Sequence, residues 1–136
     1  MKSRSNELLD KSIAAMISAI EIYNKPDFLY RGETFSILAI NSWELLFKAK
    51  LLKDNHNKMR SLYVTEQIRN KDGSKSKRRR IKLTRSGNPF THSIDYIAEK
   101  LIATGKLDRT VWDNITALIE LRDSAIHFYN YSAKFN

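Results

Sequence analysis

Apolar residues recur at helical spacing through most of this chain, and this periodicity is the feature that most constrains its fold. Between Ser5 and Asn24 they fall three or four residues apart, with polar residues between them. They are Leu8, Leu9, Ile13, Met16, Ile17, Ile20 and Tyr23. The pattern predicts an amphipathic helix that ends before Pro26, because proline disfavours helical backbone in the residue before it.

A second helix is predicted from about Glu33 to Lys53. Its apolar residues lie on all sides between Phe35 and Leu46, where Glu44 is the only charged residue. Such a helix is typical of one that is covered on most faces. We therefore expect it at the centre of the fold.

Two more helices are predicted in the last third of the chain. One begins after Thr91, a plausible N-cap, and runs to about Thr104, with Gly105 as its C-terminal stop. The other is capped by Asp108 and runs from Arg109 to about Tyr129 with apolar residues on one arc. Length and pattern together predict a single domain over residues 1–136.

The positive charge of the chain is confined to its middle. Residues 58–85 hold 11 basic and two acidic residues, so the net charge of this segment is +9. The whole chain of 136 residues has the same net charge of +9. The remainder is neutral, so this distribution favours a local contact with a polyanion over a general role in solubility. The alternative is a solvated insertion whose charge only keeps the protein soluble.

Within the basic segment, β-branched and aromatic residues flank an Asp-Gly turn signal. The stretches Ser61–Ile68 and Arg78–Thr84 are the predicted strands of a hairpin, which is marginal in isolation and could order only on RNA. We expect RNA contacts from Tyr63, by stacking, and from its cations. These cations are Lys75, Lys77, Arg78, Arg79, Arg80, Lys82 and Arg85.

The expected fold is therefore all-α, a four-helix up-and-down bundle with a basic β-hairpin or loop, residues 58–86, inserted between the second and third helices. The chain has no cysteine, which excludes disulfides, thiolate metal sites and cysteine nucleophiles. It has no apolar run long enough for a membrane span and no signal peptide, so we expect a cytoplasmic protein without a membrane partner.

Arg122 is out of place on the apolar arc of the last helix. A buried guanidinium requires an anionic partner, and Glu44 is the partner we expect. The alternatives are an ion pair with a purely structural role, or an Arg122 side chain that extends out to solvent.

His127 follows Asp123 by four residues, so the two share a helical face. A carboxylate in that position can fix the imidazole tautomer and suit it to proton transfer. The alternative is a solvated polar stripe that includes a histidine. Arg122 and His127 themselves lie about 140° apart around an ideal helix.

The sequence lacks the motifs of metal-dependent, nucleotide-binding and serine-nucleophile enzymes. The three histidines have no metal-binding spacing, and neither of the glycine-rich phosphate loops nor a G-x-S-x-G nucleophile motif is present. The residues present can support acid–base catalysis without a metal or another cofactor.

The sequence Arg122-Asp-Ser-Ala-Ile-His127-Phe-Tyr129 resembles the R-x4–6-H signature of the HEPN superfamily. With Tyr129 it is similar to HEPN toxins that are paired with minimal nucleotidyltransferase antitoxins, in which that tyrosine is modified; Tyr129 can equally be a core aromatic. Residues 11–53, Ser86-Gly-Asn-Pro and Ile126-His-Phe-Tyr-Asn also resemble an uncharacterised bacterial domain family placed within HEPN.

This resemblance implies a metal-independent endoribonuclease that acts as a homodimer, with the two motifs facing each other across the interface. Arg122 would bind the scissile phosphate, His127 would move protons, and Asp123 would orient His127, with Glu44 in support. The products would carry 2′,3′-cyclic phosphate and 5′-hydroxyl ends. A toxin or phage-defence effector is the expected role, with an antitoxin or nucleotidyltransferase as partner.

Two other functions stay open from the sequence. The chain can be a nucleic-acid-binding or interaction module without catalysis, or a dimerisation domain cut from a larger defence protein. An assay for RNA cleavage in EDTA distinguishes the ribonuclease from the binding module without catalysis.

Overall fold

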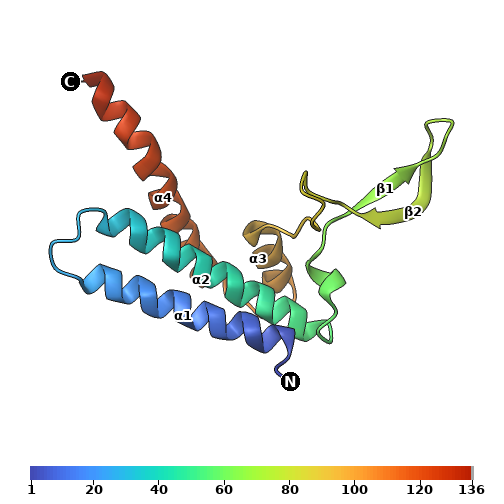
Figure 1. Ribbon diagram of the computed structural model, residues 1–136, viewed down its shortest axis with the longest axis horizontal. Helices are drawn as coiled ribbons and strands as arrows, with labels where there is room; N and C mark the ends of the chain where they lie inside the picture. The colour runs from blue at the N-terminus through green and yellow to red at the C-terminus, as the bar shows by residue number, and fades with distance from the viewer. Residues whose placement is uncertain (136) are drawn as a thin grey trace.

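The computed structural model describes the backbone of residues 1–135 and the side chains of residues 1–124. Four helices dominate it, with a two-stranded antiparallel hairpin between the second and the third (Figure 1). The elements are α1 (Arg4–Asn24), α2 (Arg31–Asp54), the 3-10 turn η1 (Met59–Leu62), β1 (Thr65–Arg69), β2 (Lys75–Ile81), α3 (Ile94–Ala103) and α4 (Arg109–Phe135). The predicted order of a mostly helical fold with an inserted basic hairpin is confirmed.

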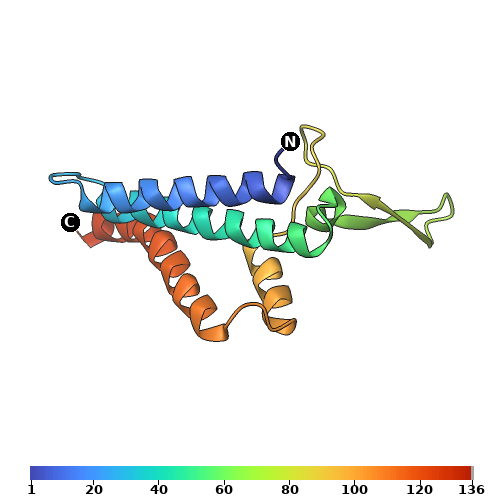
Figure 2. The same ribbon diagram turned by 90° about the horizontal axis from the view of Figure 1, so that it is seen from below.

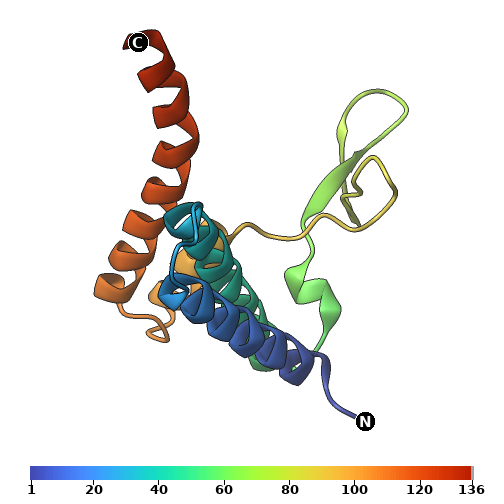
Figure 3. The ribbon, with the colours of Figure 1, turned by 60° about the vertical axis from the view of Figure 1, so that its left-hand side comes forward.

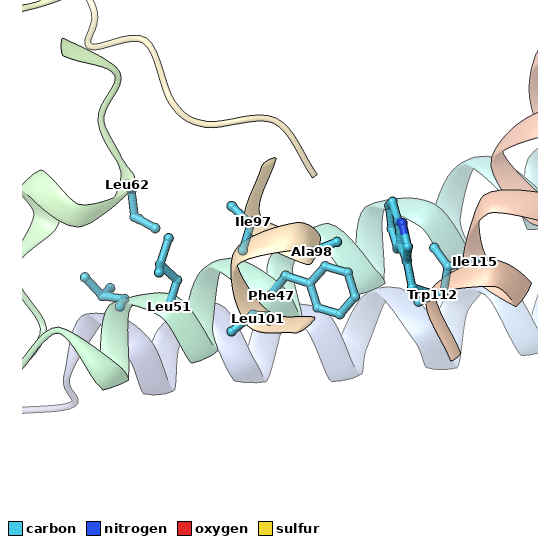
Figure 4. Close-up of a cluster of buried hydrophobic side chains, with 9 residues drawn as sticks. Phe47, Leu51, Leu62, Ile97, Ala98, Leu101, Trp112 and Ile115 are labelled. Carbon is cyan, nitrogen blue, oxygen red and sulfur yellow. The ribbon is translucent and has the colours of Figure 1, made fainter. Parts of the chain in front are cut away.

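α2 is the central helix, as its all-round apolar sequence predicts. α1 lies along one side of it and runs antiparallel to it, while α3 and α4 pack against it from another side (Figure 2). The buried core forms where α2 meets α3, η1 and the first half of α4 (Figure 4). Its members are Phe47, Leu51, Leu52, Leu62, Ile97, Ala98, Leu101, Trp112 and Ile115.

Small side chains form the contact between α1 and α2. Ser12 of α1 and Ser42 of α2 are both buried, and each hydroxyl donates to the main-chain carbonyl of the other residue, at 2.8 and 2.7 Å. Ala19 and Ala39 are also buried. Small residues let the two backbones approach closely, and the reciprocal bonds satisfy both hydroxyls inside the protein.

Several large apolar residues of α1 stay partly exposed as a result. Ile13, Ile17, Ile20 and Tyr23 are about half exposed. The periodicity predicted the helix correctly, but α2 covers the neighbouring, small-residue side of the apolar arc. Close backbone approach and two buried hydrogen bonds decide which side is covered.

The ends of α3 are set by local hydrogen bonds. The prediction that Thr91 is the N-cap is wrong. The N-cap is Ser93, whose side chain accepts from the backbone N–H of Tyr96. Thr91 instead forms a β-bridge with Tyr63. At the other end Gly105 has the left-handed backbone (φ +73°) that glycine adopts without strain, as predicted. Asp108 accepts from the N–H of Thr110, which confirms it as the cap of α4.

α4 extends further than predicted, to Phe135. Its first half packs on α2, and beyond this contact the helix diverges from α1 and α2 (Figure 3). Among the residues that the structure describes, no helix has both the length and the apolar content that a membrane crossing requires.

Candidate nucleic-acid interface

The hairpin presents cations on both of its faces. Lys75, Lys77, Arg78, Arg79 and Arg80 of β2 are exposed. Successive residues of a strand point to opposite faces, so the cations of β2 are divided between the two sides of the ribbon. The strand is longer at its start and shorter at its end than the predicted Arg78–Thr84.

Two of the five β2 cations are bound within the hairpin. Arg80 pairs with Glu66 at 3.0 Å, and Arg79 donates to the side chain and the carbonyl of Thr65, each at 3.0 Å. Lys75, Lys77 and Arg78 form no ion pair with any carboxylate whose side chain the structure describes. These three are therefore available to an external anion.

The turn of the hairpin is held by Asp72 and Gly73. Asp72 accepts from the N–H and the hydroxyl of Ser74, at 3.0 and 2.6 Å, and Gly73 has φ +87°. These hydrogen bonds, from the hydroxyl first and then the N–H, lower the pKa of the Asp72 carboxyl below its ordinary value.

A closed set of backbone hydrogen bonds forms the base of the hairpin. Val64 N–H donates to Phe90, Phe90 N–H donates to Lys82, and Lys82 N–H donates to Val64, at 2.7, 2.8 and 2.9 Å. Next to this base, Leu62 is buried in the core and its carbonyl accepts from His92 N–H. These bonds attach the hairpin to the helices through the protein's own backbone groups.

Arg122 extends toward solvent, which is one of the alternatives that the sequence leaves open. Its side chain is 36% exposed, and its Nε lies 3.3 Å from Oδ1 of Asp123. By helical spacing, Arg122 lies on the same side of α4 as Ile115 and Ile119, one turn beyond Ile119. The guanidinium therefore reaches solvent.

The predicted pair between Glu44 and Arg122 is wrong. Glu44 pairs with Lys48 one turn further along α2, at 3.3 Å. A partner four residues away on the same helix needs no tertiary contact, and this pair is therefore easier to form.

Of the three other predicted site residues of α4, the structure describes the side chain of Asp123 alone. The side chains of His127 and Tyr129 lie outside the described residues. Asp123, expected to orient His127, is described in contact with Arg122. With Nε on Asp123, the terminal N–H groups of Arg122 have no hydrogen-bond partner among the described residues, and they can bind an anion.

A group of aromatic rings beside the hairpin was not identified from the sequence. His92 stacks on Tyr96 with ring centroids 4.0 Å apart, and burial first, then Lys100, lowers the pKa of His92. Lys82 lies 4.9 Å from the ring centre of Phe90. The sequence signal that could have identified this group is the pair of aromatic residues at alternate positions, Phe90 and His92, in an extended segment.

The fold and this surface define a mostly helical protein that carries a cationic hairpin. Residues 7–136 match a family described as a domain of unknown function, DUF3644, and the chain belongs to that family. Comparison with curated proteins and with solved structures finds no match. Among the described side chains, no group of three His, Cys, Asp or Glu residues could hold a metal ion.

Proposed function

We propose that this protein binds RNA through its β1–β2 hairpin and cleaves it, without a metal, at Arg122 and His127. The observation that carries the proposal is the set of exposed β2 cations without a carboxylate partner, Lys75, Lys77 and Arg78. An RNA backbone is the polyanion whose regular charges such a strand can follow.

Arg122 is the group proposed to bind the scissile phosphate. Its Nε is held by Asp123, which leaves the terminal N–H groups to donate to phosphate oxygens and to stabilise the charge that develops on them. Asp123 thereby acts as a positioning residue for Arg122, in addition to the role on His127 that the HEPN resemblance implies.

His127 is the proposed proton-transfer group. It takes the proton of the 2′-hydroxyl as that oxygen attacks phosphorus, and it returns a proton to the 5′-oxygen as the phosphorus–oxygen bond breaks. The products are a 2′,3′-cyclic phosphate and a 5′-hydroxyl. DNA lacks the attacking oxygen and is bound without being cleaved.

The proposal also includes the type of helical bundle and the oligomeric state. The four helices correspond to an up-and-down bundle of HEPN type, and two copies form the homodimer in which two Arg122–His127 motifs share one cleft. The second half of α4 diverges from α1 and α2 (Figure 3), and this part of the helix is the proposed contact with the second copy. Action as a toxin or defence effector, with an antitoxin or nucleotidyltransferase partner, fits this activity.

A second candidate function is RNA binding without cleavage. The observation that favours it is the separation of the two sites, because the hairpin extends from the side of the C-terminal end of α2, whereas α4 ends on the side of the N-terminal end of α2 (Figure 1). α2 has 24 residues and spans about 36 Å at 1.5 Å per residue. Binding at the hairpin therefore has no need of α4.

Cleavage of labelled RNA in EDTA tests the proposal. Wild type is compared with Arg122→Ala, His127→Ala and a matched control, Arg4→Ala, which removes an exposed arginine from α1. We expect wild type and the control to produce cyclic phosphate ends, and both α4 variants to lose at least a hundredfold in rate. RNA retention without cleavage by all four proteins supports the second candidate, and a requirement for magnesium contradicts the proposed chemistry.

A further inference from the structure

Aromatic rings lie exposed where the hairpin meets α3. Phe90 is 42% exposed and Tyr96 is 47% exposed. Single exposed aromatic side chains are common, but these belong to a set, since His92 stacks on Tyr96 with 19° between the ring planes.

The backbone holds two of these rings on one side of the chain. Phe90 donates to the carbonyl of Lys82, Thr91 is bridged to Tyr63, and His92 donates to the carbonyl of Leu62. Alternate residues of such an extended segment point to the same side and lie about 6.7 Å apart along it. Phe90 and His92 therefore face the same way, and Tyr96 continues the row through its stack on His92.

Cations accompany the row at both ends. The ammonium of Lys82 lies 4.9 Å from the centre of Phe90, and that of Lys100 lies 5.8 Å from the centre of Tyr96. Lys82 directly follows β2 and belongs to the basic segment that contains the hairpin. Rings for bases beside cations for phosphates are the combination by which proteins bind single-stranded nucleic acid.

We propose that Phe90, His92 and Tyr96 form a stacking site for unpaired bases of an RNA strand whose phosphates follow the hairpin. This inference rests on the proposed function and adds its substrate class, which is single-stranded RNA. Paired bases are stacked inside a duplex and cannot reach the rings.

Acidic residues of α3 restrict the path of the strand. A shallow surface depression beside Tyr96 is lined by Asp95, Glu99 and Lys100. Glu99 is bound by both terminal nitrogens of Arg109 at 3.2 Å, while Asp95 stands in the first turn of α3. Phosphates are repelled by Asp95, so the backbone of the strand runs on the side of Lys82.

The test measures binding of fluorescent 12-nucleotide oligouridine and of a 12-base-pair RNA duplex, in a His127→Ala background that prevents cleavage. Phe90→Leu and Tyr96→Leu remove a ring and keep apolar bulk, and Tyr96→Phe keeps the ring. Tyr23→Leu is the matched control, because Tyr23 is 57% exposed on α1, outside the row.

We expect each ring-removing variant to raise the Kd for oligouridine by about five- to a hundredfold, the range for loss of one stacked base. The slope of log Kd against log salt should not change, because the phosphate contacts remain. Binding to the duplex and the behaviour of Tyr96→Phe and Tyr23→Leu should match the background protein.

The inference is overturned when ring removal leaves oligouridine binding unchanged, when it weakens duplex binding equally, or when Tyr23→Leu has the same effect. Each of these results leaves RNA binding by the hairpin intact. A background protein that binds neither probe contradicts the proposed function itself, so the two failures are distinguishable.

Discussion

The α1–α2 pair and the β1–β2 hairpin are both antiparallel pairs of consecutive elements, but different groups hold them together. Small side chains and the Ser12–Ser42 bonds join the helices, whereas backbone hydrogen bonds join the strands. In each pair the most conspicuous side chains face solvent, namely the isoleucines of α1 and the cations of β2. In both pairs, the large apolar or charged side chains are therefore left available for partners. Small side chains and backbone groups form the contacts that hold each pair together.

The largest expected effect concerns the helix pair. Ser42→Leu places a large side chain in the buried α1–α2 contact and removes the hydrogen bond that the Ser42 hydroxyl donates to the carbonyl of Ser12, so it should destabilise the protein by about 3 kcal/mol. Ile17→Gln changes a half-exposed position and should alter the free energy of unfolding by less than about 0.5 kcal/mol. Urea denaturation measures both variants.

A larger loss of stability for Ile17→Gln than for Ser42→Leu would contradict this account of the α1–α2 pair. A small loss at Ser42 means that the helices can move apart without cost, and a large loss at Ile17 means that another copy or partner covers this face of α1 in solution. Ser18→Leu, on the exposed side of α1, shows whether any added leucine is destabilising.

The sequence predicts the elements of this fold better than their contacts. The apolar periodicity, Pro26, Gly105 and Asp108 are local signals, and they place most helix ends within a few residues. The Asp72–Gly73 turn likewise predicts the hairpin. These features depend on neighbours within the same element, which a single sequence contains.

Features that depend on other elements were missed. Periodicity identifies an apolar arc on α1 but not the half of it that α2 covers. The lone charges Glu44 and Arg122 suggested a pair, although Lys48 was already in reach of Glu44. Thr91 and Ser93 are both plausible caps, and only the β-bridge to Tyr63 decides between them.

A smaller effect is expected from the hairpin, and only in binding. Replacing Lys75, Lys77 and Arg78 by Gln removes three cations without a described ion pair, so RNA affinity should fall about ten- to a hundredfold at low salt. The slope of log K against log salt should decrease in magnitude by about 2, at about 0.7 per contact for a single strand. Stability should stay close to wild type, because backbone bonds hold the strands.

The matched control for the hairpin removes three exposed charges from α1 and the turn after it, with Arg4, Lys11 and Lys25 each replaced by Gln. Its net charge equals that of the hairpin variant. Equal losses of affinity and slope in the two proteins mean that RNA responds to the total charge of the protein and that the hairpin has no special part.

The smallest effect should come from His92, at the junction of the helices and the hairpin. Burial lowers its pKa in the folded protein, so between that pKa and the ordinary value near 6.5 the unfolded chain binds more protons than the folded one. Stability therefore rises with pH in this window and is partly lost as pH falls below about 6.5. His92→Phe keeps a ring against Tyr96 and removes the titration, so urea midpoints between pH 5 and 8 should depend less on pH in this variant. An unchanged dependence assigns the titration to another group and leaves His92 as a stacking ring only.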